Sequence, residues 1–251
     1  MKALCFTLGG KTAFFKKPEV NSYYYFTYGN LHKNALLGMF GAILGYGGYT
    51  QQFQKDGQKK ELQRGYPEFY EKLEKLHVSI KPNAEKGFFS KKIQQYNNSV
   101  GYASKEAGGN LIVKEQWLEN PSWQVCVLLD SEEAELLAEY IIKRKCVYIP
   151  YLGKNDHLAD ITDMYVEEVT KQKSGEGRLI GLFLKKGAEI QQKFSLRGKR
   201  NMTYKYQEDL PLGMDVWTNQ YELETFMDTD AEVKWKNQKV YVVEGQCRMF
   251  Y

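Results

Sequence analysis

Residues 122–145 read SWQVCVLLDSEEAELLAEYIIKRK, and this stretch decides most of the fold. Its opening part, residues 122–129, is dominated by apolar side chains, which is typical of a buried strand. Asp130 and Glu133 then form a capping box, with Asp130 as the N-cap of a helix. This helix ends in a run of cations that suits its C-terminal dipole, and its apolar face consists of Ala134, Leu137, Ala138 and Ile141. We therefore predict a buried strand followed directly by an amphipathic helix.

The segments on either side of this unit continue the alternation of strands and helices. Residues 2–8 alternate well enough for a strand, and Asn30 suits the N-cap of a helix running to about Leu44. A helical patch around residues 67–76 leads into a strand near residues 77–80, and a further strand is expected at Val147–Pro150. This order of elements predicts an α+β fold built on a ferredoxin-like (split βαβ) domain.

A long β-hairpin is expected to be inserted in this domain, at about residues 86–118. Two strand-like arms, Phe88–Tyr96 and Asn110–Trp117, flank a polar stretch that contains several glycines. Beyond residue 160 the sequence shows no long helical period, and short β-prone pieces alternate with turns. We therefore expect a first domain over residues 1–159, which includes the hairpin, and a β-rich C-terminal part over residues 160–251.

The helix predicted at residues 30–44 carries a ridge of small residues, formed by Ala35, Gly38, Ala42 and Gly45. Glycine lowers helix propensity by about 0.5–1 kcal/mol relative to alanine, so a close neighbour is expected there. Packing of the helix on a sheet is the expectation, and direct contact with a ligand is the alternative. The glycine-rich residues 45–49 that follow lack the Lys-Ser/Thr ending of a P-loop, which argues against nucleotide binding of that kind.

Charge is distributed unevenly along the 251 residues, whose formal net charge is +4. Residues 1–129 carry 17 Lys and Arg against 10 Asp and Glu, whereas residues 130–251 carry 18 against 21. Residues 185–205 are strongly basic, and residues 206–232 contain eight acids and no Lys or Arg. Together with 19 tyrosines, this pattern suits a basic and aromatic surface for a polyanion and an acidic surface facing elsewhere. Two solvated faces of ordinary strands are the alternative.

The sequence also limits the compartment in which the protein works. No stretch approaches the roughly 20 apolar residues of a membrane span, and the N-terminus lacks the pattern of a signal peptide. The four cysteines, at positions 5, 126, 146 and 247, are widely scattered. We therefore expect a soluble intracellular protein with free thiols.

No catalytic or metal-binding pattern stands out. The three histidines, His32, His77 and His157, are far apart in the sequence, and none has a metal-ligand neighbour at helical or hairpin spacing. His32 and His157 would be the candidates if acid–base chemistry occurred. We expect no metal ion and no cofactor.

The loop at residues 149–157 follows the capped helix and reads IPYLGKNDH. Its exposed amides, helped by Lys154, would suit a phosphate. An ordinary connection between helix and strand explains the same residues, so the loop alone does not decide between the two.

The first fifty residues resemble a known family. The run FTLGGKTAFFKKP at residues 6–18, the tyrosines that follow and the run ALLGMFGAILG at residues 35–45 are similar to the start of CRISPR-associated proteins of the fifth Cas family. Within that family, these residues most resemble the type I-B branch. Residues 151–157, YLGKNDH, resemble the loop that follows the second helix in that family.

The resemblance implies a modified, RRM-like (RNA-recognition) fold of the RAMP type, with a protruding thumb hairpin. It implies a non-catalytic subunit of the type I CRISPR Cascade complex, which binds and caps the 5′ handle of the CRISPR RNA in the prokaryotic cytoplasm. The neighbours of such a subunit in antiviral DNA interference are the Cascade backbone subunit and the large PAM-reading subunit. Target DNA is a further partner, because the thumb wedges into the guide–target duplex; no membrane is involved.

Basic and aromatic residues of this chain fit that role. RNA that is held without pairing is gripped by phosphate contacts and by stacking of its bases on aromatic rings. Two lysines of the hairpin are expected to follow the backbone of the duplex. The candidate RNA-binding residues are Lys11, Lys16, Lys17, Tyr23, Tyr24, Tyr25, Lys91, Lys92, Lys154, Arg197, Lys199 and Arg200.

A metal-independent endoribonuclease that processes CRISPR repeat RNA is the competing function. One branch of the same family cuts repeat RNA with a Tyr, Lys and His set that activates the ribose 2′-hydroxyl. Here residues 114–117, KEQW, occupy the approximate place of the Lys-His pair of that branch and contain no histidine. We therefore expect a binding subunit rather than an enzyme.

Overall fold

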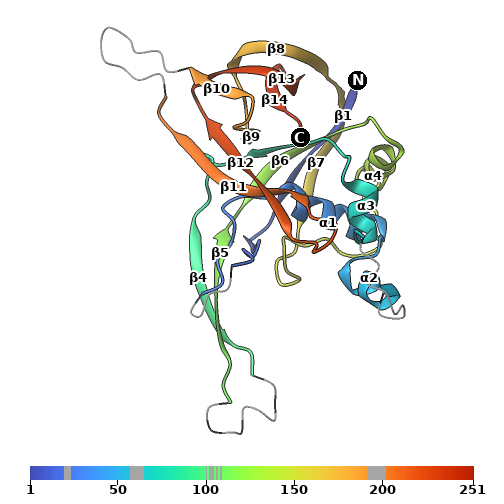
Figure 1. The fold of residues 1–251 in the computed structure, drawn as a ribbon, viewed down its shortest axis with the longest axis vertical. Helices are drawn as coiled ribbons and strands as arrows, with labels where there is room; N and C mark the ends of the chain where they lie inside the picture. The colour runs from blue at the N-terminus through green and yellow to red at the C-terminus, as the bar shows by residue number, and fades with distance from the viewer. Residues whose placement is uncertain are drawn as a thin grey trace.

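The computed structural model describes residues 1–19, 24–56, 65–99, 101, 105, 107, 109–191 and 202–251. It is an α+β structure, in which antiparallel sheets predominate and helices are few (Figure 1). The central sheet has the order β3-β6-β1-β7, and its strands are β1 (Lys2–Gly9), β3 (Val78–Pro82), β6 (Ser122–Leu128) and β7 (Asp160–Glu168). Within the described ranges, no helix is long and apolar enough to cross a membrane.

Both faces of the central sheet are covered. On one face, Phe6 of β1 packs edge-on against Phe40 of α1 (Lys33–Leu44), with ring centroids 6.3 Å apart, and Leu137 of α4 (Glu132–Ile142) joins the same core. On the other face, Ala3 and Cys5 pack against residues of the C-terminal strands. The alternation of β1 therefore serves two apolar cores, one beneath the helices and one beneath the C-terminal part.

The guanidinium of Arg248 also lies against the second face of the sheet. Arg248 is 1% exposed; its Nη2 donates to the backbone oxygen of Gln124 over 2.9 Å, and its Nε donates to Ser79 Oγ over 3.2 Å. A buried guanidinium needs such acceptors, because an unsatisfied buried donor is costly.

Both predicted N-caps are displaced by one or two residues. The α1 helix is capped by His32 rather than Asn30, and α4 is capped by Ser131 rather than Asp130. The predicted caps have other partners, since Asn30 accepts from Trp123 Nε1 over 3.0 Å and Asp130 pairs with His77 over 2.7 Å. Tertiary contacts thus take the side chains that local sequence would use for capping.

The strand predicted at Val147–Pro150 is wrong. These residues form a connection in which the Val147 and Tyr148 amides donate to the carbonyl oxygens of Ile43 and Ala42, at the end of α1. They thereby satisfy acceptors that a helix C-terminus leaves without partners. The fourth strand of the sheet is β7, which pairs with β1.

The expectation that the small-residue ridge of α1 packs on a sheet is wrong. Gly45 ends the helix with φ +82°, and a side chain there would collide with Val147 of the connection. Gly41, on the same helix, meets Phe69 of α3 (Glu68–Leu73) so closely that a Cβ would lie 2.4 Å from the Cβ of Phe69. The helix therefore packs closely on α3 and on the connection, while Ala35, Gly38 and Ala42 line a groove beside α2 (Tyr49–Asp56).

A three-stranded sheet, β2-β5-β4, carries the hairpin. β4 (Lys91–Asn97) and β5 (Ile112–Glu119) are paired antiparallel from Lys91↔Leu118 to Asn97↔Ile112, and β2 (Thr12–Ala13) pairs with the base of β5. Figure 1 shows the two strands extending away from the body of the protein. β4 lies inside the expected hairpin at about residues 86–118, and β5 begins inside it and ends one residue beyond it.

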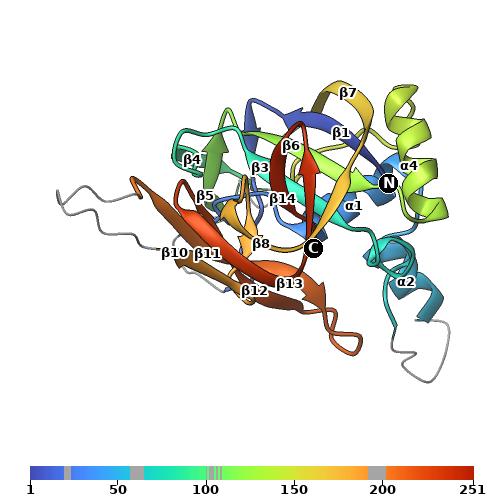
Figure 2. The same cartoon turned by 90° about the horizontal axis from the view of Figure 1, so that it is seen from above.

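The C-terminal part is composed of strands. One sheet has the order β10-β13-β14 with β8 also paired to β13, and another has the order β11-β12-β9. Figure 2 shows β10, β11, β12 and β13 gathered on one side of the molecule, away from α4. The bounds are β8 Thr170–Arg178, β9 Phe183–Leu184, β10 Ala188–Gln191, β11 Lys205–Met214, β12 Tyr221–Thr229, β13 Glu232–Val243 and β14 Gln246–Met249.

The expectation of free thiols is wrong for two of the four cysteines. Cys5 of β1 and Cys126 of β6 lie directly opposite each other in the central sheet and form a disulfide. They are separated by 121 residues in the sequence, so no local spacing of cysteines could have predicted the disulfide. Cys146 and Cys247 are free.

Candidate nucleic-acid interface

A narrow ribbon runs along the base of the hairpin, and we call it the strap (residues 14–19 and 24–28). Its two arms are antiparallel: Lys17 N donates to the Phe26 oxygen and Tyr28 N donates to the Phe15 oxygen, each over 2.8 Å. The predicted residues Lys16, Lys17, Tyr24 and Tyr25 all belong to these arms. Pairing of the two arms fixes the spacing between lysines and tyrosines that are distant in the sequence.

The strap is bound to the hairpin through backbone hydrogen bonds. Tyr25 N donates to the Lys114 oxygen and Gln116 N donates to the Tyr25 oxygen, each over 2.9 Å, so Tyr25 lies parallel to β5 at Glu115. Strap and hairpin therefore form one continuous surface with two faces, because alternation along β5 puts Glu115 and Trp117 on one face and Lys114 on the other. Sequence reasoning placed both segments in the interface and did not predict their contact.

Ammonium groups lie over aromatic rings along this surface. Lys16 Nζ is 4.0 Å from the centroid of Tyr25, and Lys114 Nζ is 5.4 Å from that of Tyr24. Lys92 Nζ is 5.9 Å from the centroid of Trp117, on the hairpin itself. Each pair is a cation–π contact, and it places a cation suited to phosphate beside a ring suited to a base.

A buried carboxylate joins the hairpin to the loop at residues 151–158. Glu115 is 5% exposed; it accepts from Tyr96 OH over 2.7 Å and from Trp117 Nε1 over 2.8 Å. Lys154 reaches it from the loop, with Nζ 3.2 Å from Glu115 Oε1 and 2.9 Å from Tyr96 OH. Burial alone lowers the pKa of Lys154, but the hydrogen bonds to Tyr96, Glu115 and Asp156 hold that pKa above its ordinary value. Lys154 therefore stays protonated and ties the loop to the hairpin.

His157 completes this junction and is removed from solvent. It is 2% exposed, and its Nδ1 lies 2.6 Å from Thr12 Oγ1. The centroid of its ring is 4.6 Å from that of Trp117. Burial lowers the pKa of His157, so the imidazole is neutral near pH 7. Its contacts are those of a structural residue that holds β2, β5 and the loop together.

One residue of the acidic segment at residues 206–232, Glu208, contacts the strap and the segment that follows it. Glu208 of β11 accepts from Gly29 N over 2.9 and 3.1 Å, and it lies 3.4 Å from Lys17 Nζ. Partial desolvation lowers the pKa of the nearby Lys91, an effect that Glu208 opposes and Lys17 reinforces. The Glu208 carboxylate thus joins the strap and the segment that follows it to the C-terminal part.

The structure brings together seven of the residues proposed from sequence: Lys16, Lys17, Tyr24, Tyr25, Lys91, Lys92 and Lys154. Lys11 is exposed in the turn between β1 and β2, and it lines a separate shallow hollow with Asn120 and Asp160. The other four, Tyr23, Arg197, Lys199 and Arg200, lie outside the described residues.

Four neighbours in this surface were not proposed from sequence: Phe26, Tyr96, Lys114 and Trp117. Phe26 is 41% exposed, with its ring centroid 6.3 Å from that of Tyr24. For the three hairpin residues, the signal that could have found them is the alternation along each arm, which puts Lys114 and Gln116 on one face and Glu115 and Trp117 on the other.

The remaining histidines have structural contacts. His32 is 4% exposed and caps α1 by accepting from Ala35 N, and burial lowers the pKa of His32 to about 3. His77 contacts both Asp130 and Lys239. Among the described residues, no group of His, Cys, Asp and Glu could hold a metal ion.

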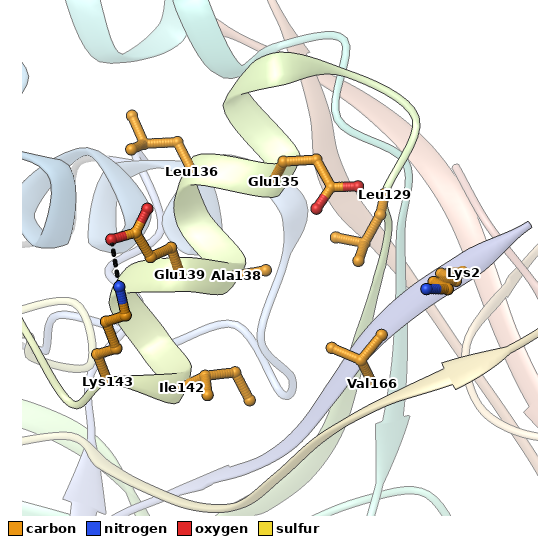
Figure 3. Close-up of a pocket in the computed structure, with 9 residues that line it drawn as sticks. All are labelled: Lys2, Leu129, Glu135, Leu136, Ala138, Glu139, Ile142, Lys143 and Val166. Carbon is orange, nitrogen blue, oxygen red and sulfur yellow. Dashed lines mark hydrogen bonds and ion pairs between the residues drawn. The ribbon is translucent and has the colours of Figure 1, made fainter.

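A second depression lies beside α4 and differs in chemistry from the strap. Figure 3 shows Leu136, Ala138 and Ile142 of α4 around it, together with Leu129 and with Val166 of β7. The Glu139–Lys143 pair at its margin is joined over 2.8 Å. Its lining contains no aromatic ring, and its charges are balanced, so it lacks the features that bind a nucleic acid.

The fold is similar to that of known proteins, although the sequence is not. No protein-family model and no curated protein matches the chain. A chain of a CRISPR RNA-guided surveillance complex matches 92% of this chain over 91% of its own length, with 13% identity and a TM-score of 0.51. A CRISPR protein from Archaeoglobus fulgidus matches 100% of this chain over 98% of its own length, with 12% identity and a TM-score of 0.52. The chain therefore shares the fold of CRISPR-associated proteins.

Proposed function

We propose that this chain is a non-catalytic subunit of a type I CRISPR Cascade complex that holds the 5′ handle of the CRISPR RNA. The observation that carries the proposal is the continuous surface of strap and hairpin, where Lys16 and Lys114 lie over the half-buried rings of Tyr25 and Tyr24. Its proposed neighbours are the backbone subunit, the large PAM-reading subunit and, in the assembled complex, target DNA. The fold shared with a chain of a surveillance complex supports this assignment.

The order of elements supports an RRM-like, ferredoxin-like domain. The helix α1 follows β1, α4 follows β6, and the sheet order β3-β6-β1-β7 puts the first and third of the four strands at its centre. The β4–β5 hairpin is inserted between the second and third of these strands. We assign it as the thumb, with Lys91 and Lys92 following the backbone of the guide–target duplex.

The physical basis of binding is the pairing of charge with stacking. A handle that is not base-paired exposes both its phosphates and the faces of its bases. Lys16 and Lys17 neutralise phosphates, while the rings of Tyr24, Tyr25 and Phe26 provide planes worth about 1–3 kcal/mol per stacked base. Backbone pairing of the strap with β5 holds these groups in place before RNA arrives, which reduces the entropy lost on binding.

The side chains at the junction support binding rather than cleavage. A base that activates a ribose 2′-hydroxyl has to reach that proton and be unprotonated. Lys154 is held in its protonated form by Glu115, and His157 is buried against Thr12 and Trp117. Neither group meets both conditions.

The binding surface is tested by salt and by one matched pair of variants. We expect log affinity for single-stranded handle RNA to fall with log salt at about 0.7 per neutralised phosphate. Lys16→Ala should weaken binding about tenfold and reduce this slope by about one phosphate. Lys143→Ala, on the surface of α4, should change neither. Fluorescence anisotropy at several salt concentrations measures both, and an affinity independent of salt would contradict the proposal.

Absence of cleavage is tested separately. Purified protein incubated with repeat RNA and EDTA should leave the RNA intact, as judged on a denaturing gel. A specific cut within the repeat would favour the endoribonuclease, and alanine replacement of each of the three histidines would then identify its base.

A further inference from the structure

The strand β7 forms an open edge of the central sheet. It is the last strand in the order β3-β6-β1-β7, and among the described residues only β1 pairs with it. At the opposite edge of the sheet, Val78 of β3 exchanges backbone hydrogen bonds with Tyr251 and is thereby covered. An uncovered edge presents N–H and C=O groups to which a strand of another chain can add. The proposed RNA-binding surface gives this edge no role.

The register of β7 shows which of its backbone groups face outward. Val169 N, just after the strand, donates to the Met1 oxygen over 2.7 Å, so these two residues form a hydrogen-bonded pair. Hydrogen-bonded and non-hydrogen-bonded pairs alternate along an antiparallel ladder, so Val166 and Glu168 direct their N–H and C=O groups away from β1. Neither residue has another backbone hydrogen-bond partner in the described part of the chain.

A β-bulge limits the usable part of this edge. The register of β7 shifts between Cys5 and Thr7 of β1, and Asp163 lies in the left-handed region with φ +51°. A bulge bends and twists its strand, which interrupts regular pairing with a further strand. Regular pairing is therefore available at residues 164–168.

One face of the open edge is apolar. The depression shown in Figure 3, which we call the α4 trough, lies between α4 and β7 and has a volume of about 610 Å³. Its lining includes Val166, Ile142 and Leu136, whose side chains are 43%, 43% and 39% exposed. Because successive side chains of a strand point to opposite faces, a strand added beside β7 would place every second side chain over this trough.

The other face of the same edge is acidic. β7 contains four carboxylate residues and no Lys or Arg. Glu167 lies on the face opposite to Val166, where its Oε1 accepts from Glu244 N over 3.0 Å. Hydrogen bonds from Tyr165 and Gln124 lower the pKa of Glu244, so this carboxylate stays ionised near pH 7. Neither glutamate forms an ion pair with a described residue.

Charge distinguishes between the possible occupants of this edge. A second copy of the chain would set the acidic β7 against itself, and like charges on opposing strands destabilise their pairing. A nucleic acid is repelled by the same carboxylates. A basic segment of a different protein is attracted by them.

We propose that β7 accepts an extended segment of a partner protein, in which apolar and basic residues alternate. The segment pairs antiparallel with Val166 and Glu168 through backbone hydrogen bonds. Its apolar side chains lie in the α4 trough, because directly opposed residues of two strands share a face. Its basic side chains lie on the other face, beside Glu167 and Glu244.

The test uses synthetic peptides with the full chain, because the partner is defined by its chemistry. The probe is fluorescein-labelled KVKIKVK, and EVEIEVE is its charge-reversed control. Two further versions of the probe are N-methylated, one at its two valines and the other at its two inner lysines. N-Methylation removes a backbone donor and keeps the side chain. In the proposed pairing the valines direct their amides towards β7 and the inner lysines direct theirs away.

KVKIKVK should bind and should slow hydrogen exchange of the Val166 and Glu168 amides. Methylation of its valines should weaken binding about tenfold to a hundredfold, the loss of two hydrogen bonds, whereas methylation of its lysines should not. EVEIEVE should bind at least about tenfold more weakly than KVKIKVK. Fluorescence anisotropy measures these affinities. No binding of KVKIKVK, equal affinities of the two methylated peptides, or equal affinities of KVKIKVK and EVEIEVE would each overturn the proposal.

One pair of protein variants tests the trough. Ile142→Lys puts a cation into the α4 trough and should weaken binding of KVKIKVK about tenfold. Leu223→Lys is the matched control, because Leu223 of β12 is 48% exposed and does not line the trough, and it should leave the affinity unchanged. Equal affinities of the two variants would show that the trough takes no part and would overturn the proposal.

Sedimentation velocity tests the alternative occupant. A dimer of the unmodified protein that Ile142→Lys dissociates would make a second copy the occupant and would overturn the proposal of a separate partner. These measurements contain no nucleic acid, so their failure would leave the proposed handle-binding function intact.

Discussion

The central sheet and the base of the hairpin are stabilised by different forces. Beneath α1 and α4, β1 contributes Leu4, Phe6 and Leu8, all fully buried, to an apolar core. At the hairpin base Leu118 joins the same core, but the buried groups also include Glu115 and His157, which are held by hydrogen bonds. Apolar burial depends little on pH or salt, whereas a network of charges depends on the protonation of each member. The position of the hairpin is therefore expected to respond to conditions that leave the sheet unchanged.

The largest effect should come from the apolar core. Trp123 is fully buried, its ring lies 5.9 Å from Phe15 and 5.1 Å from Phe89, and it donates to Asn30. Trp123→Ala should lower the free energy of unfolding by about 3–5 kcal/mol in urea denaturation. Trp217→Ala is the matched control, because Trp217 is 60% exposed, and it should change stability by about 0.5 kcal/mol. Equal effects of the two changes would contradict the assignment of the core.

A smaller loss of stability is expected from a substitution at the junction of Glu115 with Lys154, Tyr96 and Trp117. Glu115→Gln keeps the shape of the side chain and removes the charge that Lys154, Tyr96 and Trp117 contact. We expect a loss of about 1–2 kcal/mol, which is below the range of about 1.5–3 kcal/mol for hydrogen bonds to charged groups because Lys154 is one-third exposed. The same change at Glu119, which lies 4.0 Å from Lys92 at the surface, should cost less than about 1 kcal/mol. Hydrogen exchange should show that Glu115→Gln loosens β4 and β5 while β1 and β6 stay protected.

The dependence of stability on pH tests the other side of the comparison, because His32 is a titratable group that is buried at the start of α1, in the main body rather than at the hairpin. The folded-state pKa of about 3 lies below the ordinary value of 6.5, so protonation favours the unfolded chain. Stability is therefore fully present above pH 6.5 and is lost as the pH falls towards 3, by about 1.4 kcal/mol per pH unit. Between pH 6.5 and 5 the loss should be about 2 kcal/mol. His32→Asn keeps a capping acceptor for Ala35 and should flatten the profile. Identical slopes in this variant and the unmodified protein would exclude His32 as the titrating group.

The elements that sequence predicted best are those with complete local signals. The strand and helix at residues 122–145 are both present, because continuous apolar burial and a first turn rich in carboxylates act over a few residues. The N-caps were displaced because Trp123 and His77 recruit Asn30 and Asp130 from a distance. Val147–Pro150 has the composition of a strand, yet its amides are used to end α1. In each case a long-range contact outweighed a local preference.

The candidate site was predictable in its residue types and not in its construction. Lysines and tyrosines at residues 16–25 indicated a surface for a polyanion, and the structure gathers them at the hairpin. Nothing local indicates that Tyr25 pairs with Glu115, since the contact spans some ninety residues of chain. A single glutamate in a hairpin arm looks like a solvated side chain, so the central role of Glu115 was not foreseen.

The covered second face of the central sheet has a consequence for where RNA can go. Domains of the RNA-recognition type usually stack bases on the open face of a four-stranded sheet. Here Tyr241, Val243 and Phe250 cover that face of the sheet, and the Arg248 guanidinium is also bound to it. Under the proposed function, an RNA strand would therefore lie at the margin of the domain and stack on tyrosines outside the four-stranded sheet.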